Sequence, residues 1–228
     1  MKIFTIDDFY IFLKTHTETS ENLIYRGVKR DDFELIPSVG RIKRKDGNQL
    51  TGDDENRLLK VFKHRAFQFI KDYINDDLEL LSIAQHHGLP TRLLDWTKNP
   101  LIAVYFAVEE AFKDEDLSKT EFSCIYIHKP KTKANLDSTF NPFEIDIVRR
   151  YIPKYWDARI IGQNELFTVH NKPYEPWSPD GLKKILIHYG IRKDIKTTLN
   201  RFGINPSTIY PDLDGIAKHV KWLRSNEH

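Results

Sequence analysis

The stretch Ala84–Phe112, AQHHGLPTRLLDWTKNPLIAVYFAVEEAF, places histidine, arginine, aspartate and tryptophan side chains on a short segment that runs into an apolar sequence. The apolar sequence predicts a helix, with Asn99 as its N-cap and Pro100 in its first turn. Gly88 predicts the end of a preceding helix over Leu78–Gly88. A loop that only joins two helices needs none of these polar side chains, so the stretch indicates a functional site.

The rest of the chain predicts helices first and strands later. A first helix is expected after a cap at Thr5 or Asp7, and a second over Asp53–Ile74, where apolar residues recur at helical spacing. Since the elements do not alternate regularly, we predict one α+β domain over residues 1–228, with early helices packed on a small, mainly antiparallel sheet. Strands are expected over Asn22–Gly27, Phe122–His128, Glu165–His170 and Leu182–His188, and closing helices over Ile191–Gly203 and Asp212–Arg224.

Composition excludes several classes of protein. The 228 residues carry a net charge of +2, so bulk basicity does not indicate nucleic acid or an acidic membrane. The basic run Arg41–Gln49 is interpreted as a solvated loop. Cys124 is the single cysteine, which excludes an internal disulfide and a cysteine-based zinc site, and its strand-like neighbours predict a buried thiol. No apolar run approaches the ~20 residues that a membrane span requires, so a cytoplasmic protein is expected.

The polar residues before Asn99 each have a structural interpretation. Arg92 and Asp95, three residues apart, form either a local ion pair or part of an anion site at the following helix N-terminus. His86 and His87 are able to cap the end of the preceding helix. Because adjacent histidines diverge by about 100° on a helix, the two cannot easily bind one metal ion, and no metal site is expected.

Two blocks of the sequence resemble the FRG domain, which is named for a Phe/Tyr-Arg-Gly motif. Tyr25, Arg26 and Gly27 match that motif. The block Gln85–Pro100 matches QHxGxPTRLLDWTxNP without a gap, and Arg41 fits the last position of a P-S-x-x-R motif. The match at these positions identifies the chain as a member of the FRG family.

Two later segments extend the resemblance. Residues 158–170, ARIIGQNELFTVH, resemble the family's late R-I-x-x-Q-x-G-x-F segment, and residues 199–217 resemble its closing helix–loop–helix. Glu165 stands where the family usually has glycine, which places a carboxylate beside Gln163. Membership alone does not supply an activity, because the family is defined by sequence more than by chemistry.

The order of these motifs is also similar to the ADP-ribosyltransferase architecture. That fold has an Arg or His on an early strand, a strand-to-helix segment along the nicotinamide pocket, and a Glu or Gln at a late strand. Arg26, the segment Thr91–Asn99 and the pair Gln163 and Glu165 follow this order. The resemblance implies an NAD-dependent ADP-ribosyltransferase or NAD glycohydrolase, which would act as a toxin or phage-defence effector with an antitoxin or immunity partner and a macromolecular acceptor.

The resemblance also implies roles for individual residues. Arg26 would hold a phosphate or ribose, and Tyr105 would stack on nicotinamide. Gln163 or Glu165 would accept a hydrogen bond from the ribose 2′-hydroxyl, and His86 would transfer a proton to an acceptor. Further contacts to the dinucleotide are expected from Tyr25, Gly27, Gln85, Thr91, Arg92, Asp95 and Asn99.

Other interpretations stay open at this point. Arg26 pairs with Asp95 in the core in one of them, and Tyr105 packs in the core rather than against a ligand. The whole chain is then a non-catalytic module that binds a nucleotide, a nucleic acid or a protein. A metal-dependent hydrolase built on His86, His87 and Asp95 ranks last. The enzyme hypothesis requires the stretches near positions 26, 92 and 164 to meet around one hollow.

Overall fold

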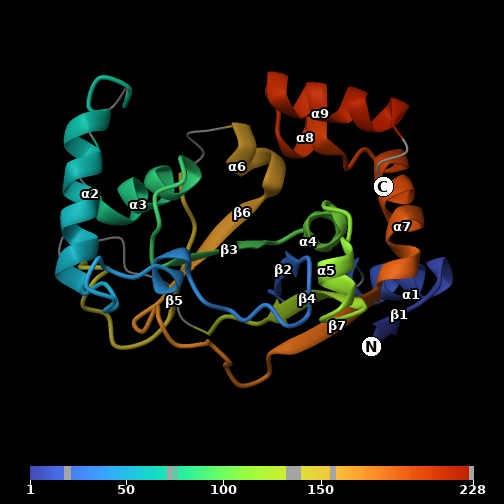
Figure 1. Ribbon diagram of the computed structural model, residues 1–228, viewed down its shortest axis with the longest axis horizontal. Helices are drawn as coiled ribbons and strands as arrows, with labels where there is room; N and C mark the ends of the chain where they lie inside the picture. The colour runs from blue at the N-terminus through green and yellow to red at the C-terminus, as the bar shows by residue number, and fades with distance from the viewer. Residues whose placement is uncertain (18–21, 71–73, 75, 132–139, 155–157, 226–228) are drawn as a thin grey trace.

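A seven-stranded mixed sheet forms the centre of the computed structural model, which describes residues 1–17, 22–70, 74, 76–131, 140–154 and 158–225. The strand order is β1-β7-β4-β2-β3-β6-β5. Only β1 and β7 pair in parallel within these residues; the other five pairings are antiparallel. Helices α2 and α3 lie at one end of the sheet and α7, α8 and α9 at the other (Figure 1). The predicted α+β domain with a mainly antiparallel sheet is confirmed.

Each predicted helix and strand is present in the structure, which also has three strands and three short α-helices that the sequence did not predict. The strand predicted over Phe122–His128 has the same bounds in the structure, whereas α2 ends at Ala66 rather than at Ile74. Part of that predicted helix, residues 71–73, lies outside the described residues. The strands are β1 (Lys2–Ile3), β2 (Ile24–Val28), β3 (Leu93–Thr97), β4 (Phe122–His128), β5 (Arg149–Tyr151), β6 (Glu165–Val169) and β7 (Lys183–His188). The α-helices are α1 (Ile6–Thr17), α2 (Gly52–Ala66), α3 (Asp77–His86), α4 (Pro100–Val108), α5 (Asp114–Leu117), α6 (Ala158–Gln163), α7 (Arg192–Arg201), α8 (Pro206–Ile209) and α9 (Leu213–Arg224), and short 3₁₀ turns span Ser38–Arg41 and Tyr189–Ile191.

The segment before α4 is a strand, which corrects the expectation of a loop. Residues Leu93–Thr97 form β3, a central strand that pairs with β6 over its whole length. Leu93, Leu94 and Trp96 are all buried, because both faces of a central strand are covered. Such a strand lacks the alternation of apolar and polar residues that marks a half-exposed strand, which explains why the sequence pattern did not reveal it.

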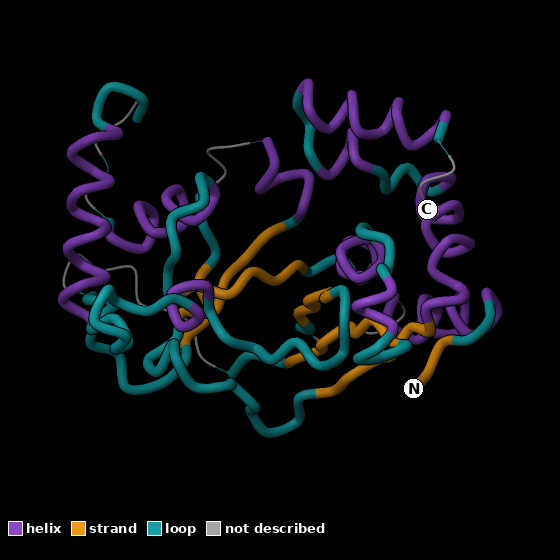
Figure 2. The backbone as a smooth tube through the Cα atoms, in the orientation of Figure 1, coloured by secondary structure: helices purple, strands orange, loops and turns teal. Residues whose placement is uncertain are grey.

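The sheet opens between β2 and β3. These two strands share one residue pair, Tyr25 with Thr97, whereas β2 and β4 share five pairs and β3 and β6 another five. The strands therefore diverge beyond that pair, and the backbones of β2 and β3 separate in the tube drawing (Figure 2). This opening separates the core on one face into two clusters, one around α4 and one around α2 and α3.

Helix α4 covers β2 at unusually short range. Asn99 caps the helix by accepting a hydrogen bond from the Leu101 N–H at 2.9 Å, as predicted. A Cβ atom built on Gly27 would lie 1.8 Å from the Ala103 carbonyl oxygen. A side chain at position 27 would therefore push α4 away from the sheet, which gives the glycine of the Tyr-Arg-Gly motif a packing role.

A buried polar chain crosses the opposite face of the sheet. The indole N–H of Trp96 donates to the Thr168 hydroxyl at 2.9 Å, and that hydroxyl lies 2.9 Å from Nε2 of His170. Burial, together with the charges of Arg26 and Arg92, lowers the pKa of His170 to about 3. The His170 imidazole is therefore neutral at physiological pH and belongs to the core.

This lowered pKa predicts a pH dependence of stability. Between the usual pKa of 6.5 and about 3, the unfolded chain binds a proton at His170 that the folded chain does not. The free energy of unfolding should therefore fall as the pH drops through this window, by up to about 1.4 kcal/mol per pH unit from this group. Urea unfolding at several pH values measures this slope. The His170→Asn variant should have a shallower slope, and an unchanged slope would contradict the assignment.

Candidate functional site

A cavity of about 590 Å³ occupies the opening between the two halves of the sheet. Its walls come from β2, β3, the C-terminal ends of α3 and α4, and the segment that joins α6 to β6. We call this the central cavity. Six aromatic residues contribute to its lining, Tyr25, Phe33, Trp96, Phe106, Phe167 and Tyr210.

Arg26 bridges the two strands where the sheet opens. Its Nη1 donates to the Asp95 carbonyl oxygen at 2.8 Å and to the Asp95 carboxylate at 3.2 Å. The Arg26 side chain is 18% exposed, so the pair is only partly shielded from solvent. The structural pairing of Arg26 with Asp95 is thus present, and it lies in the lining of the central cavity rather than in a sealed core.

A chain of hydrogen bonds orients Asp95. The Thr91 hydroxyl donates to the amide oxygen of Gln85, and the amide nitrogen of Gln85 donates to the Asp95 carboxylate. The Thr91 end of this chain is held in place, because the Thr91 N–H also donates to the Ser38 hydroxyl at 3.0 Å. Gln85, Thr91 and Asp95 of the long motif therefore fix the position of the arginine of the short motif.

A second guanidinium group increases the positive charge at this end of the cavity. The Nε of Arg41 donates to the Ile36 carbonyl oxygen at 3.1 Å. Burial and then the charge of Arg26 lower the pKa of Arg41, and the nearby charge of Asp95 opposes this effect. Two guanidinium groups thus lie near the single carboxylate of Asp95, which pairs with Arg26, so this end of the cavity favours an anion.

The carboxylate of Glu165 faces the cavity from the neighbouring strand. Tyr25, Thr97 and Glu165 form one lateral row across β2, β3 and β6, so their side chains share a face of the sheet. Because neighbouring strands lie about 4.8 Å apart, the backbones of Tyr25 and Glu165 are separated by about 10 Å. Phe167, two residues along the same strand, is 2% exposed. Because residues 165 and 167 lie on the same face of β6, the Glu165 side chain is on the buried face of the strand, as expected.

A tight turn precedes Glu165 and places Gln163 at the same wall. Asn164 has a φ of 46°, a left-handed conformation that asparagine tolerates better than most residues. The Gln163 amide donates to the Ile209 carbonyl oxygen at 3.2 Å, and its own carbonyl oxygen accepts from the Thr97 hydroxyl at 2.7 Å. These bonds tie the end of α6 to α8 and to β3.

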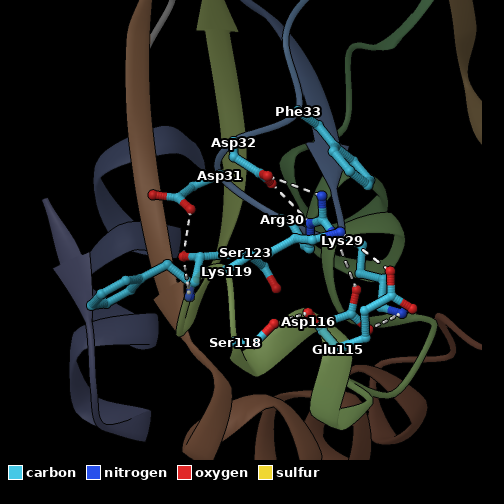
Figure 3. A network of polar contacts seen from close by, with 12 residues as sticks. Lys29, Arg30, Asp31, Asp32, Phe33, Glu115, Asp116, Ser118, Lys119 and Ser123 are labelled. Carbon is cyan, nitrogen blue, oxygen red and sulfur yellow. Dashed lines mark hydrogen bonds and ion pairs between the residues drawn. The ribbon is translucent and has the colours of Figure 1, made fainter.

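The opposite wall is fixed by an ionic network (Figure 3). Asp116 of α5 contacts Lys29 Nζ at 2.6 Å and Arg30 Nη1 at 3.4 Å. Hydrogen bonding from Lys29 is the largest cause that lowers the pKa of Asp116 to about 2. Arg30 also binds Asp32 through two bonds of 2.9 Å, with its guanidinium over the Phe33 ring. The network holds the segment after β2 against α5. Lys29 and Phe33, which line the cavity, belong to this segment.

The structure brings most of the predicted site residues to the central cavity. Those that line it are Tyr25, Arg26, Gly27, Gln85, His86, Asp95, Gln163 and Glu165. The four that do not are Thr91, Arg92, Asn99 and Tyr105. The stretches that contain Arg26 and Gln163 thus meet at this cavity with Asp95 of the long motif, whereas Arg92, the residue of that motif that the enzyme hypothesis named, does not line it.

Arg92 has a structural position instead of a ligand-facing one. It is 2% exposed and binds both oxygens of Glu55, at 2.9 and 2.6 Å. Its Nη1 donates to the carbonyl oxygens of Pro142 and His170. The expectation of a local Arg92–Asp95 ion pair is wrong, because residues three apart on an extended strand point to opposite faces.

Tyr105 and Asn99 also serve the scaffold. Tyr105 is 1% exposed, and its hydroxyl donates to the Glu109 carboxylate at 3.3 Å, while burial raises its pKa. Core packing therefore accounts for Tyr105, and helix capping accounts for Asn99. Cys124 is fully buried, as predicted, and burial raises its pKa to about 12.

Sequence reasoning missed several residues of the cavity. The basic run that contains Arg41 predicts a solvated loop, although Arg41 fits the last position of the P-S-x-x-R motif. Arg159 and Tyr210 come from the late segments that resemble the family, and Arg159 binds Asp212 at the start of α9. Motif membership was the signal that could have identified all three.

Two negative findings hold for the described residues. No group of three or more His, Cys, Asp or Glu side chains among them is arranged to hold a metal ion. The rings of His86 and His87 contact each other edge to face, with their centroids 5.2 Å apart. None of the helices that the structure describes has the length and apolar character needed to cross a membrane.

Comparison with known proteins supports the interpretation of the motifs. Residues 21–116 match the family model of the FRG domain. Neither curated proteins nor solved structures gave a significant match. The matched range contains both Arg26 and the Gln85–Asp95 chain that holds it; the extension of the domain to residues 1–228 stays a prediction.

Proposed function

Because the chain belongs to the FRG domain family, whose two motifs meet here at one cavity, we propose that the protein binds NAD in the central cavity. It would break the bond between nicotinamide and ribose, as an ADP-ribosyltransferase or an NAD glycohydrolase. The observation that carries the proposal is the convergence of Arg26, Asp95, Gln163 and Glu165 on this cavity from four separate elements.

The size and the charge of the cavity support this proposal. Its volume of about 590 Å³ lies in the range of ligand sites, which is roughly 300–1,000 Å³. Arg26 is paired with Asp95 and Arg41 lies near both, so the positive charge of the two arginines at this end of the cavity suits the diphosphate. Glu165, on the neighbouring strand β6, lines the same cavity with a carboxylate, which is able to accept a hydrogen bond from a ribose hydroxyl.

The reaction requires little nucleophilic chemistry from the protein. When the nicotinamide–ribose bond breaks, both bonding electrons go to the nicotinamide nitrogen, and the ribose carbon becomes positively charged. The Glu165 carboxylate would stabilise this charge, and Arg26 would keep the phosphates in place. Water or an acceptor nucleophile then bonds to the ribose carbon and releases its proton, for which His86 is the candidate base at the cavity wall.

An NAD-consuming activity would give the protein a biological role as a toxin or phage-defence effector. Such an enzyme depletes the NAD of the cell that makes it, so we propose that an antitoxin or immunity protein restrains it. A partner that covers the mouth of the central cavity would suffice, because every proposed catalytic side chain lines that cavity.

A second candidate is a nucleotide-binding module without catalysis. The observation that favours it is that cavity residues also bind one another: Arg26 binds Asp95, and the Gln163 amide binds the Ile209 carbonyl oxygen. Both bonds are compatible with a preformed binding site that holds a ligand and leaves it intact.

Incubation of the purified protein with NAD separates the two candidates. The enzyme should release nicotinamide, detected by chromatography, alone or after addition of cell extract as a source of acceptor. The Arg26→Ala variant should bind NAD more weakly, by about tenfold or more in Kd, because it removes a charge-assisted hydrogen bond to phosphate. NAD binding without nicotinamide release would support the binding module, and the absence of NAD binding would reject both assignments to NAD.

A further inference from the structure

A second cavity of about 560 Å³ lies between the C-terminal end of α4, α7 and α9. Five lysines contribute to its lining: Lys29, Lys113, Lys196, Lys218 and Lys221. We call it the lysine pocket. Among the residues that the structure describes, Glu109 and Glu110 are the carboxylates that line it with them.

The lysine pocket concentrates positive charge in a chain that is nearly neutral. The whole chain has a net charge of +2, yet this pocket alone has five lysines against two glutamates. Glu109 is already engaged by the Tyr210 hydroxyl at 3.1 Å and by Lys218. Lys29 is paired with Asp116 at 2.6 Å, so the five lysines face three carboxylates of the described residues, and an anionic ligand would offset the remaining positive charge.

Lys196 is half-buried beside these charges. Its Nζ donates to the Glu109 carbonyl oxygen at 2.8 Å, a neutral acceptor. Burial lowers the pKa of Lys196, and the charges of Lys218 and Arg192 lower it further, against the influence of Glu109. A negatively charged group in the pocket would relieve this repulsion.

An aromatic ring lies among the lysines. Trp222 of α9 lines the pocket, with Lys196 Nζ 5.9 Å from its ring centroid. Lysines that contact phosphates and an aromatic side chain that stacks on a base are the combination that binds single-stranded nucleic acids. An acidic peptide would match the charge but gives no reason for the indole, and carboxylates favour the two-pronged contact of arginine over lysine.

The lysine pocket adjoins the central cavity. Lys29, Glu109 and Glu110 line both, so these three side chains form a shared wall. A strand held by its phosphates in the lysine pocket would therefore place a neighbouring nucleotide next to the central cavity.

We propose that the lysine pocket binds the phosphate groups of a single-stranded nucleic acid, and that this nucleic acid is the acceptor in the reaction. The acceptor role rests on the proposed NAD chemistry, whereas the phosphate site does not. Transfer would form a bond between the ribose carbon and a nucleophilic atom of the strand, while nicotinamide leaves with the bonding electrons and the displaced proton passes to a base or to solvent.

Binding of a fluorescently labelled oligothymidylate, measured by anisotropy without NAD, tests the phosphate site. The Lys113→Gln, Lys221→Gln double variant should bind roughly tenfold more weakly at low salt, and its plot of log affinity against log salt should be shallower by about 0.7 for each phosphate that a lysine no longer neutralises. The matched control is the Lys45→Gln, Lys60→Gln double variant, which removes two exposed lysines that do not line the pocket and should bind like the wild type.

Three results would overturn the proposal: no binding of oligothymidylate by the wild type, equal losses of affinity in both double variants, or displacement by a polyglutamate peptide of equal charge as readily as by unlabelled oligothymidylate. The acceptor role is tested by a mass increase of the oligonucleotide after incubation with NAD. Nicotinamide release without oligonucleotide binding rejects the lysine pocket alone, and oligonucleotide binding without nicotinamide release rejects the NAD chemistry alone.

Discussion

Replacement of Glu55 by alanine is expected to lower the free energy of unfolding by about 3–5 kcal/mol, because it leaves the buried Arg92 guanidinium without its counter-charge. Glu55 and Arg92 have side chains that are only 3% and 2% exposed, and two hydrogen bonds join them. The Tyr174 hydroxyl, 3.4 Å from Glu55, would lose its acceptor as well. Urea unfolding followed by circular dichroism measures the change.

Two controls define what the Glu55→Ala result means. The Glu115→Ala variant removes an exposed partner of Lys119, and its free energy of unfolding should change by less than about 1 kcal/mol. The Glu55→Leu, Arg92→Met double variant removes both charges and should recover part of the stability. Recovery should be incomplete, because the Pro142 and His170 carbonyl oxygens no longer have a donor. A Glu55→Ala effect as small as that of Glu115→Ala would contradict the buried ion pair.

Replacement of Glu165 by glutamine is expected to lower the rate of nicotinamide release by about 10²–10³-fold, because a neutral amide stabilises the developing ribose charge poorly. The affinity for NAD should change little, since glutamine retains an oxygen that accepts from a ribose hydroxyl. Kinetics of nicotinamide release and a separate NAD titration provide the two readouts. The pattern of a lower kcat at nearly constant Kd distinguishes weaker transition-state stabilisation from weaker binding.

The control for Glu165→Gln is Glu175→Gln, an exposed carboxylate that forms a surface ion pair with Lys172. This variant should release nicotinamide at the wild-type rate. Both variants should unfold at the same urea concentration as the wild type, which separates chemistry from folding. A Glu165→Gln enzyme that retains the wild-type rate would remove Glu165 from the mechanism and leave Gln163 as the remaining candidate at that wall.

The longer helices and the strands β2, β4, β6 and β7 were predictable because local signals define them. Asn99 and Pro100 mark the start of α4, and the apolar and aromatic run Phe122–His128 gives β4 its bounds. β3 was not predictable in this way, because its two faces contact different cores and its residues do not alternate. The two-residue strand β1 is too short to leave any pattern, and its pairing with β7 is set by tertiary structure.

The sequence predicted where the candidate site lies, but it did not predict which partner each side chain contacts. The motifs that contain Arg26 and Asp95 predicted that these residues meet, and they do. The partner of Arg92 was not predictable, since Glu55 lies on α2 and no local spacing connects the two. Arg41 is exposed, as a run of basic residues predicts, but it also lines the central cavity, which the basic run alone does not indicate.

The hydrogen-bond chain Thr91–Gln85–Asp95–Arg26 has a consequence for any attempt to exchange parts between relatives. The Tyr-Arg-Gly tripeptide and the longer block are far apart in the chain, yet they operate as a single mechanical unit. A chimera that contains only one of the two segments would lack either the Asp95 partner of Arg26 or the arginine that Asp95 binds. The two segments must be grafted together.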